Sequence, residues 1–96
     1  MLWAGRQYQI TTVATADELA ELLLNRMWPV EMGVRFGGRL YLNTFVNQDQ
    51  RQDYDVVDER KLELVDSIAI SKEMSREWLR DIAQRLVADT DDDEVA

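Results

Sequence analysis

The spacing of the apolar residues switches between the period of a strand and the period of a helix, and this limits the folds open to the chain. Residues 6–13 alternate as a strand does. A helix is predicted over residues 15–27, because Thr15-Ala16-Asp17-Glu18 has the form of a capping box and leucines follow at helical spacing. A second helix is predicted over residues 72–88, with Ser71 as its N-cap. Its apolar stripe consists of Met74, Trp78, Leu79, Ile82, Leu86 and Val87.

The middle of the chain is predicted to form strands. Short apolar runs precede and follow Gly37-Gly38, and another lies at residues 54–57. Residues 61–70 fit either a strand or a helical face, and the alternation of their leucines and isoleucines favours the strand. We therefore predict an α+β fold in the order β-α-β-β-(β)-β-α. It has an antiparallel sheet of four to five strands with two helices packed on one face.

The pair Gly37-Gly38 marks a hairpin whose register depends on the loop length. A two-residue turn pairs Val34 with Tyr41. A three-residue loop, Phe36-Gly37-Gly38, pairs Val34 with Leu40 and gathers the aliphatic residues on one face. We predict the three-residue loop for this reason, although it also places two arginines opposite each other.

Charge is distributed unevenly along the chain of 96 residues. It holds 19 acidic and 11 basic residues, a net charge of −8, and residues 89–96 carry five of the acids and no base. A chain of this length forms one core, so we predict a single compact domain over residues 1–88 and a disordered acidic tail over residues 89–96. The negative charge disfavours direct binding to nucleic acid or to a membrane, and it attracts a protein partner with a basic surface.

The chain has neither cysteine nor histidine. This removes disulfides, thiolate chemistry, the commonest general base and the commonest metal ligand. Neither a phosphate-binding glycine motif nor a nucleophile elbow is present. We therefore predict a protein that is not an enzyme, with no catalytic residues and no cofactor. The lack of a signal sequence and of a long apolar run predicts a cytoplasmic location.

Five acidic residues lie within one stretch of eleven: Asp49, Asp53, Asp55, Asp58 and Glu59. A loop or hairpin tip is expected at residues 47–53, which have no apolar side chain. Carboxylates suit Ca²⁺ or Mg²⁺, but the glycine and the glutamate of an EF-hand loop are missing, so no metal ligand is assigned. Carboxylates spaced along an edge also imitate the phosphates of a nucleic acid. We predict that these five bind a basic surface of a partner.

Aromatic residues are further candidates for partner binding. Tyr41 and Phe45 share one face of their strand, and helices on the other face would leave this one open as a contact surface or homodimer seam. Trp3 lies in a terminal segment, where an exposed indole is a typical contact residue. Trp28 and Trp78 are assigned to the core.

Together these features predict a small, acidic, non-catalytic protein-binding module. Inhibitor and immunity proteins, including those carried by phages and mobile elements, have this physical character. One alternative is a structural homo-oligomer or assembly subunit built through the Tyr41/Phe45 face. The second alternative is a divalent-ion-binding domain that uses the acidic stretch.

Overall fold

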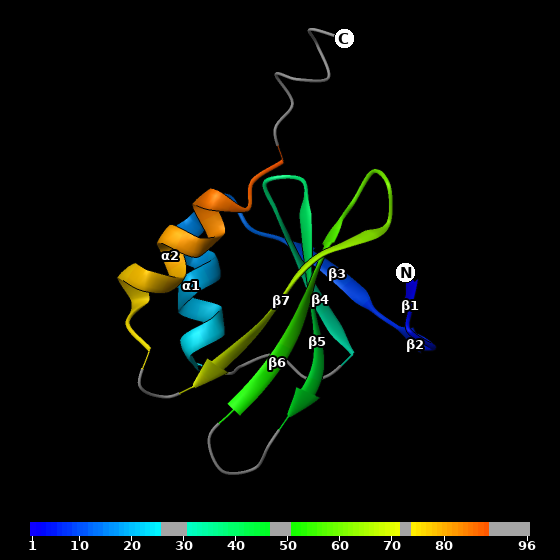
Figure 1. The fold of residues 1–96 in the computed structure, drawn as a ribbon, viewed down its shortest axis with the longest axis horizontal. Coiled ribbons are helices and arrows are strands. Elements are labelled where there is room, and N and C mark those ends of the chain that lie inside the picture. The colour runs from blue at the N-terminus through cyan, green and yellow to red at the C-terminus, as the bar shows by residue number, and fades with distance from the viewer. Residues whose placement is uncertain (26–30, 47–50, 72–73, 89–96) are drawn as a thin grey trace, which may run out of the picture.

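The structure is a computed structural model, and it describes residues 1–25, 31–46, 51–71 and 74–88. The chain begins with the short strands β1 (Leu2–Trp3) and β2 (Arg6–Gln7), followed by β3 (Gln9–Thr12) and α1 (Ala16–Asn25). Four longer strands come next: β4 (Met32–Phe36), β5 (Arg39–Val46), β6 (Arg51–Asp58) and β7 (Glu63–Ser71). The helix α2 (Arg76–Arg85) is the last element (Figure 1). β6 therefore includes part of the segment predicted as a loop or hairpin tip.

Five strands form one sheet in the order β3-β4-β5-β6-β7, and β1 and β2 form a separate hairpin. The α+β class is confirmed, and residues 63–71 form the predicted strand. The prediction of a purely antiparallel sheet is wrong, because β3 and β4 run parallel. The helix α1 joins them, and a helix packed on a sheet returns the chain to the end where the first strand began. The other three pairings are antiparallel.

The caps of the two helices test the predicted helix starts. Thr15 Oγ1 accepts a hydrogen bond from the Glu18 amide at 3.1 Å, as the capping-box spacing predicts. The prediction for the second helix is wrong by one turn. Ser71 is the last residue of β7 and pairs with Arg51, whereas Ser75 is the N-cap and accepts from the Trp78 amide at 3.1 Å. A strand that continues to residue 71 leaves that serine no freedom to cap a helix.

The hairpin between β4 and β5 has the two-residue turn, so the predicted three-residue loop is wrong. Phe36 pairs with Arg39 and Val34 pairs with Tyr41. Gly37 and Gly38 both have positive φ, at 60° and 77°, which is the requirement of a type I′ turn. Consequently Tyr41 shares a face with Val34, and the leucines of β5 point to the opposite side of the sheet.

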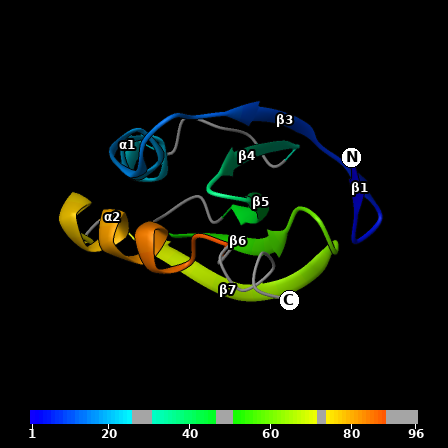
Figure 2. The ribbon, with the colours of Figure 1, turned by 90° about the horizontal axis from the view of Figure 1, so that it is seen from above.

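Both faces of the sheet are covered, each by its own group of buried residues. The helix face carries a core of Val34, Tyr41, Tyr54, Val56 and Ile70 under α1 and α2. The opposite face, called the second face below, carries Leu40, Leu42 and Val57 under Tyr8, Trp3 and Met1. Figure 2 shows the helices on one side of the strands and the β1–β2 hairpin on the other. The predicted placement of both helices on one face is therefore confirmed.

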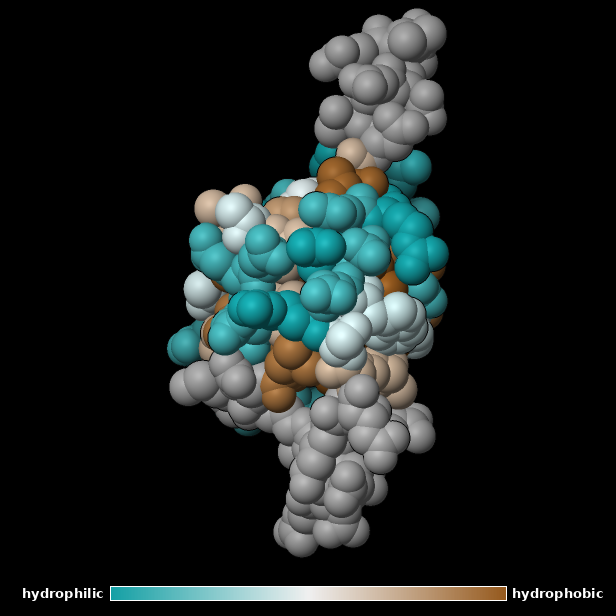
Figure 3. Space-filling view, turned by 90° about the vertical axis from the view of Figure 1, so that its left-hand side faces the viewer, coloured by the Kyte–Doolittle hydropathy of each residue, from teal (hydrophilic) through white to brown (hydrophobic). Residues whose placement is uncertain are grey.

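Trp78 does not belong to the core, and the prediction that it does is wrong. Its exposed fraction is 46%, whereas that of its neighbour Leu79 is 1%. The buried side of α2 is centred on Leu79 and Ala83, and one residue along a helix turns the side chain by about 100° away from that side. The surface of the helix layer in Figure 3 is mostly hydrophilic, with hydrophobic residues in separate patches. Trp28 lies outside the described residues.

Candidate protein-binding surface

The predicted partner-binding residues Asp53 and Asp55 alternate with buried Tyr54 along β6, so both lie on the second face. Asp55 is held from two sides. The Trp3 indole Nε1 donates a hydrogen bond to its Oδ2 at 3.0 Å, and the Ser67 hydroxyl donates to its Oδ1 at 3.2 Å. The structure thus brings together two residues, Trp3 and Asp55, that the sequence proposed on separate grounds. Both are half-buried.

A shallow hollow of about 280 Å³ surrounds these carboxylates. Its floor comes from β5, β6 and β7, and it is lined by Thr44, Asp53, Tyr54, Asp55, Ser67, Ile68 and Ala69. The β5 strand bulges here, because the pairing shifts between Asn43 and Phe45. Arg6 Nη1 donates to the Thr44 carbonyl oxygen at 2.9 Å and ties the β1–β2 hairpin to this bulge. The result is a carboxylate-lined depression with walls held by hydrogen bonds.

The other two described acids of the stretch have arginine partners. Asp58 forms an ion pair with Arg39, and Arg35 Nε donates to Glu59 Oε2 at 2.7 Å. Asp58 Oδ1 also accepts from the amides of Arg60 and Lys61, each at 2.9 Å, and so holds the turn between β6 and β7. These two residues stabilise the fold, and their charges are offset by neighbours. Asp49 lies outside the described residues.

The hydrogen bond from the Lys61 amide is the largest cause that lowers the pKa of Asp58 below its ordinary value of 3.8. The Arg60 amide and the Arg39 guanidinium add to this effect, and desolvation opposes it. A carboxyl group with a lowered folded pKa stabilises the fold above its unfolded pKa, and this contribution is lost as the pH falls through the folded pKa. Stability from Asp58 is therefore present at neutral pH and is lost below about pH 4.

The substitution Asp58→Asn should lower the melting temperature at pH 7. The difference from the unsubstituted chain should shrink as the pH falls below about 4, because Asp58 then becomes neutral as well. Thermal unfolding followed by circular dichroism between neutral and acid pH measures this. A difference that stays constant down to the acid limit would show that the charge of Asp58 contributes nothing.

The aromatic face predicted from Tyr41 and Phe45 is not an open surface at Tyr41. The exposed fraction of Tyr41 is 1%, because the two-residue turn places its ring under the helices. Burial is the main cause that raises the pKa of its hydroxyl. Among the described residues, this hydroxyl has no hydrogen-bond partner. Phe45 pairs with Asp53 in the sheet. The homodimer seam proposed for this face thus loses the contact residue Tyr41.

Sequence reasoning missed an exposed apolar group at the start of β7. Leu62 and Leu64 each have an exposed fraction of 54%, and that of Val65 is 39%. The strand pairing shifts between Val56 and Val57, which leaves Val65 as an extra residue in β7. Leu62 lies in the turn before β7 with a φ of 56°. The interruption of the alternation by an aspartate, Asp66, was the signal of this irregular strand.

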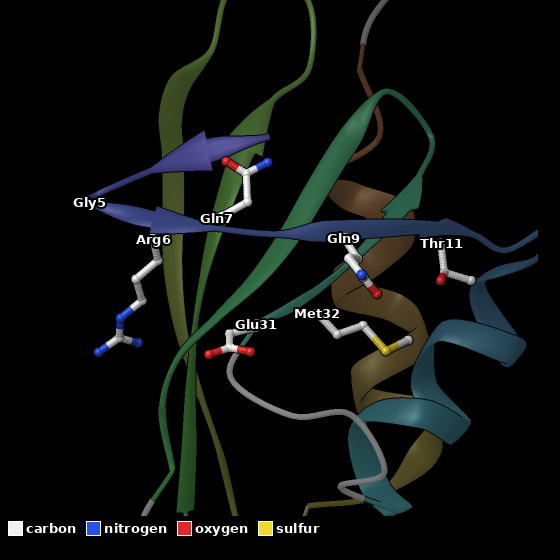
Figure 4. A pocket seen from close by; sticks show the side chains of 7 residues that line it. All are labelled: Gly5, Arg6, Gln7, Gln9, Thr11, Glu31 and Met32. Carbon is white, nitrogen blue, oxygen red and sulfur yellow. The ribbon is translucent and has the colours of Figure 1, made fainter.

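A larger hollow, of about 870 Å³, follows the opposite edge of the sheet. It is lined by Gly5, Arg6, Gln7, Gln9, Thr11, Glu31 and Met32. Figure 4 shows the side chains of Arg6 and Glu31 on one side of β2 and that of Gln7 on the other. Arg6 already donates to the Thr44 carbonyl oxygen. The hollow is thus a polar strip beside an edge strand, with an arginine engaged in holding the fold.

No group of three or more Asp, Glu, His or Cys side chains is arranged to hold a metal ion in the described ranges. No helix in these ranges is both long enough and apolar enough to cross a membrane. Comparison with protein-family models, with curated proteins and with solved structures found no match to this chain.

Proposed function

We propose that this protein is a small, acidic, non-catalytic module that binds a basic surface of a partner protein. The observation that carries the proposal is the exposed surface of β7 and its turn. Here the exposed residues Leu62, Leu64 and Val65 are sequence neighbours of the exposed acidic residues Glu63 and Asp66. An exposed apolar patch beside charged residues is typical of a protein interaction surface.

The second face adds fixed negative charge to this surface. Asp55 is held by Trp3 and Ser67, so it needs little ordering when a partner binds. Ser67 and Asp55 are cross-strand neighbours, which places this carboxylate next to β7. The net charge of −8 steers a basic partner toward the protein. A groove that binds nucleic acid phosphates is one surface of this chemistry, and the module would inhibit such a partner by occupying it.

The proposal is tested by capture of partners from an extract of the cells that make the protein. The bait is the full chain, and the test variant combines Asp55→Asn, Glu63→Gln and Asp66→Asn. We expect one protein with a basic surface, bound at low salt, released at high salt and lost with the test variant.

A matched control variant removes the same number of charges elsewhere, through Glu18→Gln, Glu77→Gln and Asp81→Asn on the helix layer. It should retain the partner, because these residues belong to α1 and α2 and do not belong to β7 or its turn. Equal loss of the partner with both variants would show that only the net charge matters. Retention by both would contradict the proposed surface. Melting curves confirm that both variants are folded.

A further inference from the structure

The strand β7 is an edge of the sheet. It pairs with β6 on one side, and no strand of the described residues lies on its other side. Figure 2 shows β7 and α2 along one long side of the molecule, opposite α1 and β3. A free edge offers a row of backbone N–H and C=O groups to another extended chain. Peptides and partner strands commonly bind to such edges by adding a strand.

A groove between β7 and α2 lies beside this edge. It has a volume of about 180 Å³ and is lined by Asp66, Ile68, Ile82, Arg85 and Leu86. Trp78 lies four residues before Ile82 on α2, so its half-exposed ring continues the same side of the helix. A strand added to β7 would direct every second side chain toward α2. Apolar side chains at these positions would contact Ile68, Ile82 and Trp78.

The remaining side chains of an added strand would point to the second face. On this face β7 presents the small residues Ser67 and Ala69 opposite Asp55 and Asp53 of β6. Neighbouring strands lie about 4.8 Å apart, so an added strand would be about 10 Å from β6. A lysine or arginine side chain is long enough to cross Ser67 or Ala69 and meet these carboxylates.

Charge favours a basic segment of a partner over a second copy of this chain as the strand added to β7. Two copies would each bring a net charge of −8 to the contact. Antiparallel pairing of β7 with itself about its central residue, Ser67, would also bring Asp66 of one copy near Asp66 of the other. Like charges opposite each other destabilise strand pairing. A basic extended segment is attracted to this edge instead, because its side chains reach the carboxylates of Asp53 and Asp55.

We propose that β7 binds an extended segment of a partner protein in which basic and apolar residues alternate. The apolar side chains occupy the groove between β7 and α2, and the basic side chains cross Ser67 and Ala69 to Asp55 and Asp53. This inference rests on the proposed function and specifies the mode of binding and the partner's sequence pattern.

The test uses the full chain and a synthetic octapeptide in which lysine alternates with valine. A control octapeptide has the same composition with its lysines and valines in separate blocks. We expect the alternating peptide to bind at least about tenfold more tightly by calorimetry. Binding should protect backbone amides of β7 from hydrogen exchange. An alternating peptide with N-methylated backbone nitrogens keeps the side chains but lacks donors, and it should not bind.

Two variants of the protein locate the binding site. The substitution Trp78→Ala removes the half-exposed indole one helical turn before Ile82, and Asp53→Asn with Asp55→Asn removes the carboxylates. Each should weaken binding of the alternating peptide by about tenfold, a loss typical of a central contact residue. The control variant Glu77→Gln with Asp81→Asn removes two negative charges from α2, as many as the double aspartate variant removes from β6. It should bind the alternating peptide as the unsubstituted chain does.

The outcomes separate this inference from the proposed function. Equal binding of both octapeptides, or binding without protection of β7, would overturn strand addition. If a basic partner is still captured from the cell extract and is released at high salt, the proposed function stands without strand addition at β7. Protection of β7 that rises with protein concentration in the absence of peptide would assign the edge to a second copy and overturn the inference. Failure of both the extract and the peptide would contradict the proposed function as well.

Discussion

Replacing Leu79 by alanine is expected to lower the free energy of unfolding by about 2–5 kcal/mol. Leu79 has an exposed fraction of 1% and belongs to the core that joins α2 to the helix face of the sheet. The other groups of that core come from α1, β4, β5, β6 and β7, so the site has little room to collapse around a cavity. Urea unfolding followed by circular dichroism measures the loss.

The neighbouring substitution Trp78→Ala is the matched control for this prediction. Trp78 is the larger residue, but nearly half of its side chain is exposed, at 46%. We expect a loss of about 1 kcal/mol or less, because substitutions at exposed positions have small effects. The opposite order, with Trp78→Ala costing more than Leu79→Ala, would mean that α2 is rotated about its axis by one residue.

The difference between Trp78 and Leu79 also explains why the position of α2 is easier to predict from the sequence than its buried side is. The stripe from Met74 to Val87 was wide enough to include both Trp78 and Leu79. A periodic pattern identifies a helix but gives the centre of its buried face only to within about one residue, or 100°. The start of the helix was ambiguous for a similar reason. Two serines, Ser71 and Ser75, precede the stripe, and only strand pairing with β6 excludes the first.

The faces of the sheet are harder to predict from the sequence under the assumption that only one of them is buried. That assumption favoured the longer loop at Gly37-Gly38, which gathers the aliphatic residues on one side. In the structure both faces of β5 are buried, with Tyr41 on one and Leu40 and Leu42 on the other. An alternation of large aromatic and aliphatic residues is compatible with either register. The positive φ angles of Gly37 and Gly38 are those of the two-residue turn.

The candidate site was predicted in part. The acidic stretch indicated Asp53 and Asp55, and their alternation around Tyr54 follows from the period of a strand. The partners of Asp58 and Glu59 were not predictable, because Arg39 and Arg35 come from other strands and meet them only through the sheet register. The groove beside β7 depends on the placement of α2, which is a tertiary contact of residues distant in sequence.

The sequence did not predict that the β1–β2 hairpin covers the second face. Tyr8, which directly follows β2, packs against that face and holds the hairpin on it. Tyr8 has an exposed fraction of 2% and packs with Leu40, Leu42 and Val57. Its hydroxyl donates to the Asn43 carbonyl oxygen at 2.9 Å. The same hairpin carries Trp3, which holds Asp55. Stability of the hairpin and geometry of the acidic site are therefore coupled through Tyr8.

The substitution Tyr8→Ala should consequently cost about 3–5 kcal/mol, the range for loss of a large buried aromatic side chain. Tyr8→Phe keeps the ring and removes only the hydrogen bond to Asn43, so it should cost about 1 kcal/mol. Urea unfolding gives both values. Hydrogen exchange at the amides of Leu40 and Leu42 reports whether the second face is uncovered.

The hydrogen bond between Trp3 and Asp55 links the substitution Tyr8→Ala to the binding of a basic partner. If the hairpin detaches in the Tyr8→Ala variant, Asp55 loses its indole partner and the binding of a basic partner should weaken, although Asp55 itself is unchanged. The Tyr8→Phe variant should bind as the unsubstituted chain does. Full binding by Tyr8→Ala would show that the carboxylates act without the hairpin. Equal stability losses for the two variants would assign the role of Tyr8 to its hydroxyl and not to the packing of its ring.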